Sequence, residues 1–534
     1  MPFRSKTDVQ FLPVYLWMIL LSLGTLAIYL RLTYPTINIG LWDFAIVADG
    51  AWRIINDQIP HLNFSTPLGP VIFWVGALGM KLAGLTLMGF NLGFCIVGAM
   101  VTILIFLIGS NRMSLLWAFF YTLICGSYLL TPRILHYTEA QLGFVGSYNT
   151  LAFGLLFLIF VDLFPISQSN LDSKKEFGFG FLTGAATAIL FFLKITFGFI
   201  AVGFLAYKLL FLKNRKPHAL GMFAGLTTLL LALWAYFGFN FRPMLRDLAI
   251  VGHSRLSAFS FLNFSLITDI VWFADCWCLL GTFLLCKMFQ RINERYSYSK
   301  RHISHYFSQE SLFFVLMINV VGIMIIRTIT QPPEFVIAGP IAIILLNNCR
   351  FRITRFHSLR NALSILLIGF LLSCGTFLWV EPLRKNLAAF GVMQAIHQSN
   401  SCGHLNGVNM SDGCITDNTN RQNDAFKALR TIVHSDDHVM SVGENNIYSL
   451  TLNLKPPKNN ILYWHKGVTF NETVLDEFSI FNSETLFQDV TIVMIPINRD
   501  ASWSKPFFSK YYSFLKKTFT HKIRTEYWDI FLKN

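Results

Sequence analysis

The sequence has few charged residues for its length. Only 13% of its 534 residues are charged, which is about half of the usual share in soluble domains, whereas 54% are hydrophobic and 53 are phenylalanine. A soluble fold cannot bury this much apolar surface. The composition therefore argues against a soluble enzyme and predicts a polytopic membrane protein.

A cleavage site is missing after the first apolar segment. Residues 11–30 contain no charge, and 20 such residues suffice to cross a hydrocarbon core about 30 Å thick. No small-residue pattern follows them that a signal peptidase would recognise. We therefore expect this segment to remain as a membrane anchor.

Acidic residues are scarce in the apolar part of the chain. Residues 1–380 carry 27 Lys and Arg against 14 Asp and Glu, whereas residues 381–534 carry 16 against 15. The basic excess therefore belongs to the loops between apolar segments, where it indicates membrane topology and contact with lipid headgroups. This distribution argues against a nucleic-acid partner.

Helix-length apolar segments recur along residues 1–380. Eleven candidate spans lie at 11–30, 89–110, 114–131, 147–164, 178–193, 195–212, 218–238, 263–289, 311–327, 335–347 and 361–380. With the N-terminus in the cytoplasm, the basic loops stay on the inner side through all eleven spans. The first loop, residues 31–88, and the whole tail then lie outside. We interpret residues 70–87 as a re-entrant or surface helix, because a span there would invert the later loops.

The tail, residues 381–534, is predicted to be a soluble α/β domain. Short β-type runs (HVMSV, NNILYW and DVTIVMIP) alternate with helix-like stretches. Two cysteines, Cys402 and Cys414, favour a disulfide in an oxidising compartment. A zinc site that adds His404 is the minor alternative. No glycine-rich phosphate loop separates strand from helix, so a nucleotide site there has no support.

The first outer loop holds several polar residues in an expected helix over 41–55. Asp49 and Arg53 are i,i+4 neighbours in the favourable acid-first order, which predicts a structural ion pair. Asp43 has no basic partner at i+3 or i+4. It lies near the helix start, where an aspartate often caps free N–H groups. Local sequence alone leaves capping and catalysis equally open for Asp43.

Charged residues also occur in the later outer-face segments. For each cation alone, snorkelling to lipid headgroups is a sufficient explanation. Together, cations from several loops on one face fit an anionic phosphate group. Lys194 is the strongest single candidate because its turn is very short. The other charged candidates are Arg133, Glu139, Arg246, His253, Arg255 and Arg327.

Three segments carry a resemblance to a known family. They are residues 43–70 (DFAIVADGAWRIINDQIPHLNFSTPLGP), 146–156 (GSYNTLAFGLL) and 192–198 (FLKITFG). They resemble GT-C glycosyltransferases, in particular the branch of protein O-mannosyltransferases and lipid A aminoarabinose transferases, including uncharacterised bacterial members. The similarity covers about the first 200 residues and extends beyond them only as architecture. It implies a GT-C transmembrane domain over residues 1–380 in a bacterial inner membrane, with the tail as a periplasmic domain.

The resemblance also implies a reaction. Such enzymes transfer a sugar from a polyprenyl-phosphate carrier to a lipid, glycan or protein acceptor on the outer face, with inversion. Asp43 matches the acidic residue that acts as general base or orients the acceptor, and Glu139 is the nearest second acid. The cations named above would bind the leaving phosphate, and Tyr148 and Asn149, which belong to a Tyr-Asn signature, are further candidates for binding the substrate or its phosphate.

The first loop differs from the family pattern at two positions. The usual glycine before the turn is Asn56 or Asp57 here, and the usual aspartate before phenylalanine is Asn63. Asparagine tolerates the left-handed backbone that glycine would supply. Because no dense carboxylate cluster is present, we expect no required metal or other cofactor.

Two other classes of function remain open at this stage. A transporter or flippase of lipid-linked sugars would need an intramembrane path, which is usually built from repeated halves or broken helices. No clear internal repeat is visible, and Asp269 and Asp275 alone do not make a relay. A structural assembly protein with a decayed site is the third reading, and Asp43 together with Lys194 argues against it.

Overall fold

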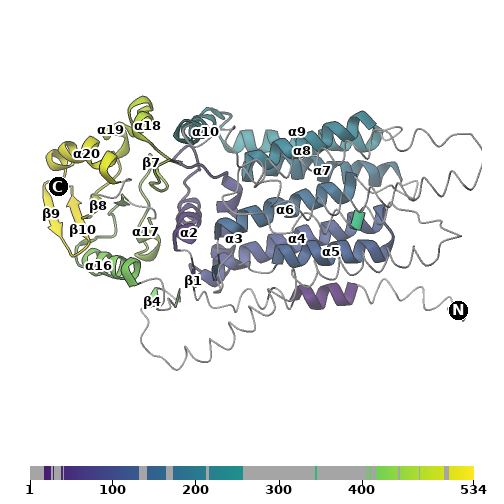
Figure 1. The fold of residues 1–534 in the computed structure, drawn as a ribbon, viewed down its shortest axis with the longest axis horizontal. Helices are drawn as coiled ribbons and strands as arrows, with labels where there is room; N and C mark the ends of the chain where they lie inside the picture. Colours follow the sequence, from purple (N-terminus) through teal and green to yellow (C-terminus); the bar gives the residue numbers. More distant parts are fainter. Residues whose placement is uncertain are drawn as a thin grey trace, which may run out of the picture.

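The computed structural model has two parts that lie along its long axis, a helical bundle and a smaller part built around a β-sheet (Figure 1). The structure describes residues 17–25, 28, 38–39, 41–130, 141–142, 144–163, 172–211, 216–255, 343–344, 404–405, 408–409, 416–442, 446–467, 469–497 and 504–533.

Six long helices form the described bundle. They are α4 (Leu87–Arg112), α5 (Leu115–Leu130), α6 (Phe144–Leu163), α7 (Ser173–Leu193), α8 (Ile195–Phe211) and α9 (Lys216–Tyr236). Three described segments, Met88–Arg112, Ser173–Leu193 and Lys216–Tyr236, are long and apolar enough to cross a membrane. The spans expected beyond residue 260 lie outside the described residues, apart from two residues at 343–344.

Helix α7 corrects one expected boundary. The apolar run suggested a short span over 178–193, but the helix begins at Ser173 and has 21 residues. Its first turn contains Lys174, Lys175 and Glu176, which a search for apolar residues leaves out. Glu176 is nevertheless buried, because it pairs with a cation from a neighbouring helix.

That ion pair belongs to a buried cluster at the end of the bundle far from the sheet. Arg112 at the end of α4 donates to both Asp162 and Glu176, with distances between 2.7 and 2.9 Å. Asp162 also accepts from Thr183 and lies 2.7 Å from His218 Nε2. Arg112 is the last residue of α4, and its buried side chain joins this helix to α6, α7 and, through Asp162, α9.

Glycines allow α7 and α9 to pack backbone against backbone. A methyl group on Gly184 would lie 2.0 Å from the Met222 carbonyl oxygen, and one on Gly225 would lie 2.0 Å from the Phe181 carbonyl oxygen. Gly180 and Gly221 make the same kind of contact, so both helices carry glycines four residues apart at this interface. Small residues at this spacing let membrane helices approach closely.

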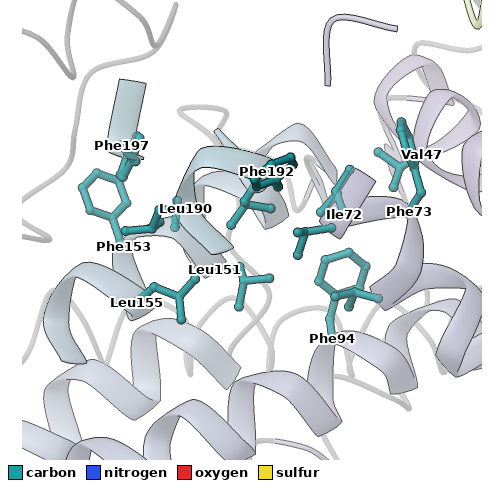
Figure 2. Close-up of a cluster of buried hydrophobic side chains, with 14 of the residues drawn as sticks. Val47, Ile72, Phe73, Phe94, Leu151, Phe153, Leu155, Leu190, Phe192 and Phe197 are labelled. Atoms are coloured by element: carbon teal, nitrogen blue, oxygen red, sulfur yellow. The ribbon is translucent and has the colours of Figure 1, made fainter. Parts of the chain in front are cut away.

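The first loop folds onto the sheet-facing end of the bundle. It comprises α2 (Leu41–Ile55), the short strand β2 (Phe64–Ser65) and α3 (Pro70–Ala83). Figure 2 shows Val47, Ile72 and Phe73 from this loop in one apolar cluster with Phe94 of α4 and Phe192 of α7. Helix α2 has the bounds that the sequence predicted, and α3 packs on α4 and α2.

A four-stranded sheet forms the centre of the tail. Its order is β6 (Val439–Ser441), β8 (Ile492–Pro496), β10 (Trp528–Leu532) and β9 (His521–Arg524). Strands β6 and β8 are parallel, whereas β8, β10 and β9 are antiparallel neighbours.

Helices flank this sheet. The two long ones are α16 (Thr416–Ile432) and α20 (Ser504–Thr518), and the short ones are α17 (Tyr448–Thr451), α18 (Glu472–Glu477) and α19 (Ser483–Leu486). The short hairpin of β4 (His404–Leu405) and β5 (Val408–Asn409) precedes α16. Cys402 and Cys414 lie outside the described residues, so their disulfide stays a prediction.

We expect Gly184→Ala to destabilise the bundle by roughly 1–3 kcal/mol, because its methyl group would meet the backbone of α9. Gly178→Ala is the matched control, since a methyl group there meets nothing within 4 Å and alanine favours a helix. Thermal unfolding in detergent should show a lower midpoint for the first variant alone. Equal midpoints for both variants would contradict this packing.

Candidate functional site

The interior of α2 contains the predicted ion pair. Arg53 Nε donates to Asp49 Oδ2 at 3.0 Å, and both side chains are 0% exposed. The remaining guanidinium contacts are new: Arg53 Nη1 lies 3.2 Å from Gln58 Oε1, 2.7 Å from the Pro457 carbonyl oxygen and 3.0 Å from Asn460 Oδ1. Arg53 therefore joins the first loop to the tail across about 400 residues of sequence.

Further hydrogen bonds continue this junction. Trp52 Nε1 donates to the Leu454 carbonyl oxygen at 2.9 Å, and Gln58 Nε2 donates to that of Pro456 at 2.6 Å. Strand β2 pairs in parallel with β7 (Asn460–Ile461), which comes from the predicted run NNILYW. That run does form a strand, but its partner is the first loop and not the tail sheet.

Burial dominates the electrostatics of Asp49. Desolvation raises the pKa of its carboxyl group to about 6, although the charge and hydrogen bond of Arg53 act in the opposite direction. Asp49 Oδ1 and Arg53 Nη2 have no hydrogen-bond partner among the described residues. A charged pair in this setting is costly to separate, so it favours a single arrangement of loop and tail.

Lys194 lies at the sheet-facing end of the bundle, in a one-residue turn between α7 and α8. Its Nζ donates to Asn149 Oδ1 at 2.8 Å. The same ammonium lies 4.9 Å from the ring centre of Tyr148 and 5.2 Å from that of Phe197. Aromatic faces attract cations, so the charge is held over α6 and α8. Three of the residues predicted for phosphate binding, Lys194, Tyr148 and Asn149, therefore meet.

The first loop reaches this cluster by its backbone. A methyl group on Gly69 would lie 2.0 Å from the Phe192 carbonyl oxygen, two residues before Lys194. The strand β1 (Asn38–Ile39) pairs in parallel with β3 (Gln141–Leu142), which precedes α6. Asp43 lies in the first turn of α2, shortly after β1, and its side chain is outside what the structure describes.

A second polar cluster ties the loop to α10 (Arg242–Arg255). Asp247 Oδ2 lies 2.9 Å from His61 Nδ1 and accepts from the Thr66 amide at 3.1 Å. Arg246, expected to bind phosphate, donates to Asp247 Oδ1 through Nε and Nη2. His61 has a φ of +66°. Asp57, at the position expected to replace a family glycine, also has a positive φ, 59°.

The other residues predicted for the site do not join these two clusters among the described residues. His253 is exposed on α10, with its Nδ1 2.8 Å from the Ala249 carbonyl oxygen and its ring near Phe478 of the tail. Arg133, Glu139 and Arg327, and the side chain of Arg255, lie outside the described residues. The described residues contain no group of three metal-ligating side chains.

Sequence reasoning missed the residues that hold the loop in place. Asn460 and Gln58 are uncharged, and each makes a contact between the first loop and the tail across about 400 residues, which no local spacing identifies. Asp247 directly follows a basic candidate in the sequence, which was a usable signal. His61 stands in the turn after Pro60, where a positive φ is rare for a residue other than glycine.

No protein-family model and no curated protein matches this sequence. Two solved structures are similar. ArnT from Cupriavidus metallidurans in the apo state is 12% identical, with a TM-score of 0.45, over 96% of this chain and 97% of that one. The Archaeoglobus fulgidus oligosaccharyltransferase, in complex with zinc and sulfate, is 10% identical, with a TM-score of 0.31, over 93% and 69%.

We expect Arg53→Met to destabilise the protein by about 3–5 kcal/mol, because it leaves Asp49 buried without its cation. Hydrogen exchange should accelerate at the amides of Asn459 and Leu462, which bond to the first loop. Arg430→Met removes an exposed arginine and serves as the control. Unchanged exchange at these two amides would contradict the role of Arg53 as the junction.

We expect the stability of the wild type to rise relative to Asp49→Asn as the pH falls from 7.5 to 5. The raised pKa means that folding favours the protonated carboxyl, so this contribution is present below the unfolded pKa and is lost as the pH rises through about 6. Its full size is about 3 kcal/mol. Unfolding midpoints of both proteins across this range test the sign, and parallel curves would refute it.

Proposed function

We propose that this protein is a membrane glycosyltransferase that moves a sugar from a polyprenyl-phosphate carrier to an acceptor on the outer face of a bacterial inner membrane. The observation that carries the proposal is the meeting of Lys194 with Tyr148 and Asn149, directly beside the Gly69 turn. These residues come from the three segments with family resemblance, and they gather at one end of the bundle.

Lys194 would stabilise the phosphate of the carrier as it leaves. Its ammonium is half-buried, so its field is screened less than that of a cation in bulk water. Asn149 and the two aromatic rings hold the charge before substrate arrives. A preorganised cation of this kind costs little reorganisation when charge develops on the leaving oxygen.

Asp43 would act on the acceptor as general base or as an orienting group. In the first case it takes the proton of the acceptor hydroxyl, whose oxygen attacks the anomeric carbon while the bond to the phosphate breaks, with inversion. Helix α2 supports either role, because Arg53 and Trp52 fix it against the tail. Glu139 is the proposed second acid. The acceptor is a lipid, a glycan or a protein, and no metal is required.

We expect Lys194→Met to lower kcat/KM for a lipid-phosphate-linked sugar at least tenfold, because the developing phosphate charge loses its nearest cation. Lys194→Arg should retain part of the activity. Lys427→Met, which removes an exposed tail lysine, is the control. Purified protein in nanodiscs, labelled donors and candidate acceptors provide the assay. Normal turnover by Lys194→Met would remove this residue from the site.

The same preparation separates transfer from transport. A folded Asp43→Asn variant should transfer sugar far more slowly than the wild type, and normal transfer would refute the role of Asp43. If wild-type protein in vesicles moves intact carrier lipid between leaflets without turnover, the protein is a transporter of lipid-linked sugars and not a transferase.

A further inference from the structure

The guanidinium of Arg246 is held along one edge. Its Nε and Nη2 lie 3.1 and 2.9 Å from Asp247 Oδ1, and Nη2 also lies 3.4 Å from the His61 carbonyl oxygen. Nη1 makes no hydrogen bond with the residues that the structure describes, and the side chain is 36% exposed. The held edge therefore directs Nη1 away from Asp247.

Asp247 has little freedom to move. Its carboxylate is 1% exposed, and it accepts from the Arg246 side chain and the Thr66 amide while its Oδ2 also contacts His61 Nδ1. A buried carboxylate is stable only while such partners are present. Because both oxygens are engaged, the carboxylate is held in one orientation. It therefore also restrains the guanidinium of Arg246, which donates to it.

His61 completes this arrangement with a strained backbone. Its φ of +66° is uncommon for a residue with a side chain, and such conformations gather at functional sites. Its amide donates to the Phe64 carbonyl oxygen at 2.8 Å. In this conformation the ring reaches Asp247 while the carbonyl group of the same residue faces Arg246.

The cluster adjoins the Lys194 site through one short turn. The Thr66 amide binds Asp247, and Gly69, three residues later, lies against the backbone of Phe192 beside Lys194. Two cations from different elements, Arg246 of α10 and Lys194 of the α7–α8 turn, are therefore each linked to one end of the turn from Thr66 to Gly69. Arginine with an oriented free edge is well suited to phosphate oxygens.

We propose that Asp247 and His61 are positioning residues, which hold Arg246 to bind the phosphate of the lipid-linked donor; this inference rests on the function proposed above. The negative charge of Asp247 offsets part of the charge on Arg246, so the benefit is orientation and not added charge. A side chain that is already held loses less conformational entropy when the phosphate binds.

A double-mutant cycle tests whether Asp247 acts through Arg246. We expect Arg246→Ala and Asp247→Asn each to raise the donor KM about tenfold, with a smaller effect on the acceptor KM. The double variant should be no worse than Arg246→Ala alone, because residues that act as a unit are not additive. Losses that multiply would overturn the proposal. Asp436→Asn changes an exposed aspartate and is the control.

Replacement of His61 gives an independent check. Asparagine keeps a donor near the position of Nδ1 and tolerates a positive φ, so His61→Asn should retain most of the donor affinity. His61→Leu removes the donor and should raise the donor KM as Asp247→Asn does. Equal losses in both variants would mean that the ring only packs, and would overturn the role of His61.

A binding measurement separates this inference from the proposed reaction. The same variants are titrated in nanodiscs with a polyprenyl phosphate that carries no sugar, so the readout needs no turnover. A non-additive cycle in binding supports the positioning role, even if no sugar is transferred and the proposed function fails. Full-strength binding by Arg246→Ala overturns the positioning role, even if the wild type transfers sugar.

Discussion

The buried guanidinium of Arg53 is the contact on which the rest of the sheet-facing end depends. A cation removed from water needs several partners, and these come from two segments about 400 residues apart: Asp49 and Gln58 in the first loop, Pro457 and Asn460 in the tail. Neither segment alone satisfies the cation. The first loop and the tail are therefore expected to fold as one unit. The tail packs against the loop and holds it in place.

The first loop is held from three directions. Arg53 and the pairing of β2 with β7 join it to the tail, Asp247 joins it to α10, and Gly69 places its turn against the end of α7. Each attachment uses a different type of contact. The tail is joined by the buried guanidinium of Arg53, α10 by the buried carboxylate of Asp247, and α7 by the close backbone approach at Gly69. A loop of this kind is part of the rigid framework, so the start of α2, which carries Asp43, has a defined place relative to Lys194.

Features that depend on local sequence were predictable, and those that depend on distant partners were not. The bounds of α2, the Asp49–Arg53 pair and the tight turn at Lys194 follow from helical spacing and from the distance between apolar runs. The buried ion pairs of Arg112 could not be predicted, because its partners on α6 and α7 meet it only when the helices pack. The role of Asp247 was missed for the same reason, since its contacts with the first loop span about 180 residues.

The two ends of the bundle use charge in different ways, and the difference favours the sheet-facing end as the site. At the far end, the buried Arg112 pairs with the carboxylates of Asp162 and Glu176. These ion pairs neutralise its charge and join four helices. At the sheet-facing end, the contacts of Lys194 include a neutral amide and two aromatic rings, and its side chain is half-buried. Arg246 is restrained along one edge of its guanidinium, and its side chain is 36% exposed. A cation that is oriented and partly accessible can bind an anion and stabilise it as a reaction proceeds, and that requires the rigid support that Arg53 and the glycine contacts provide.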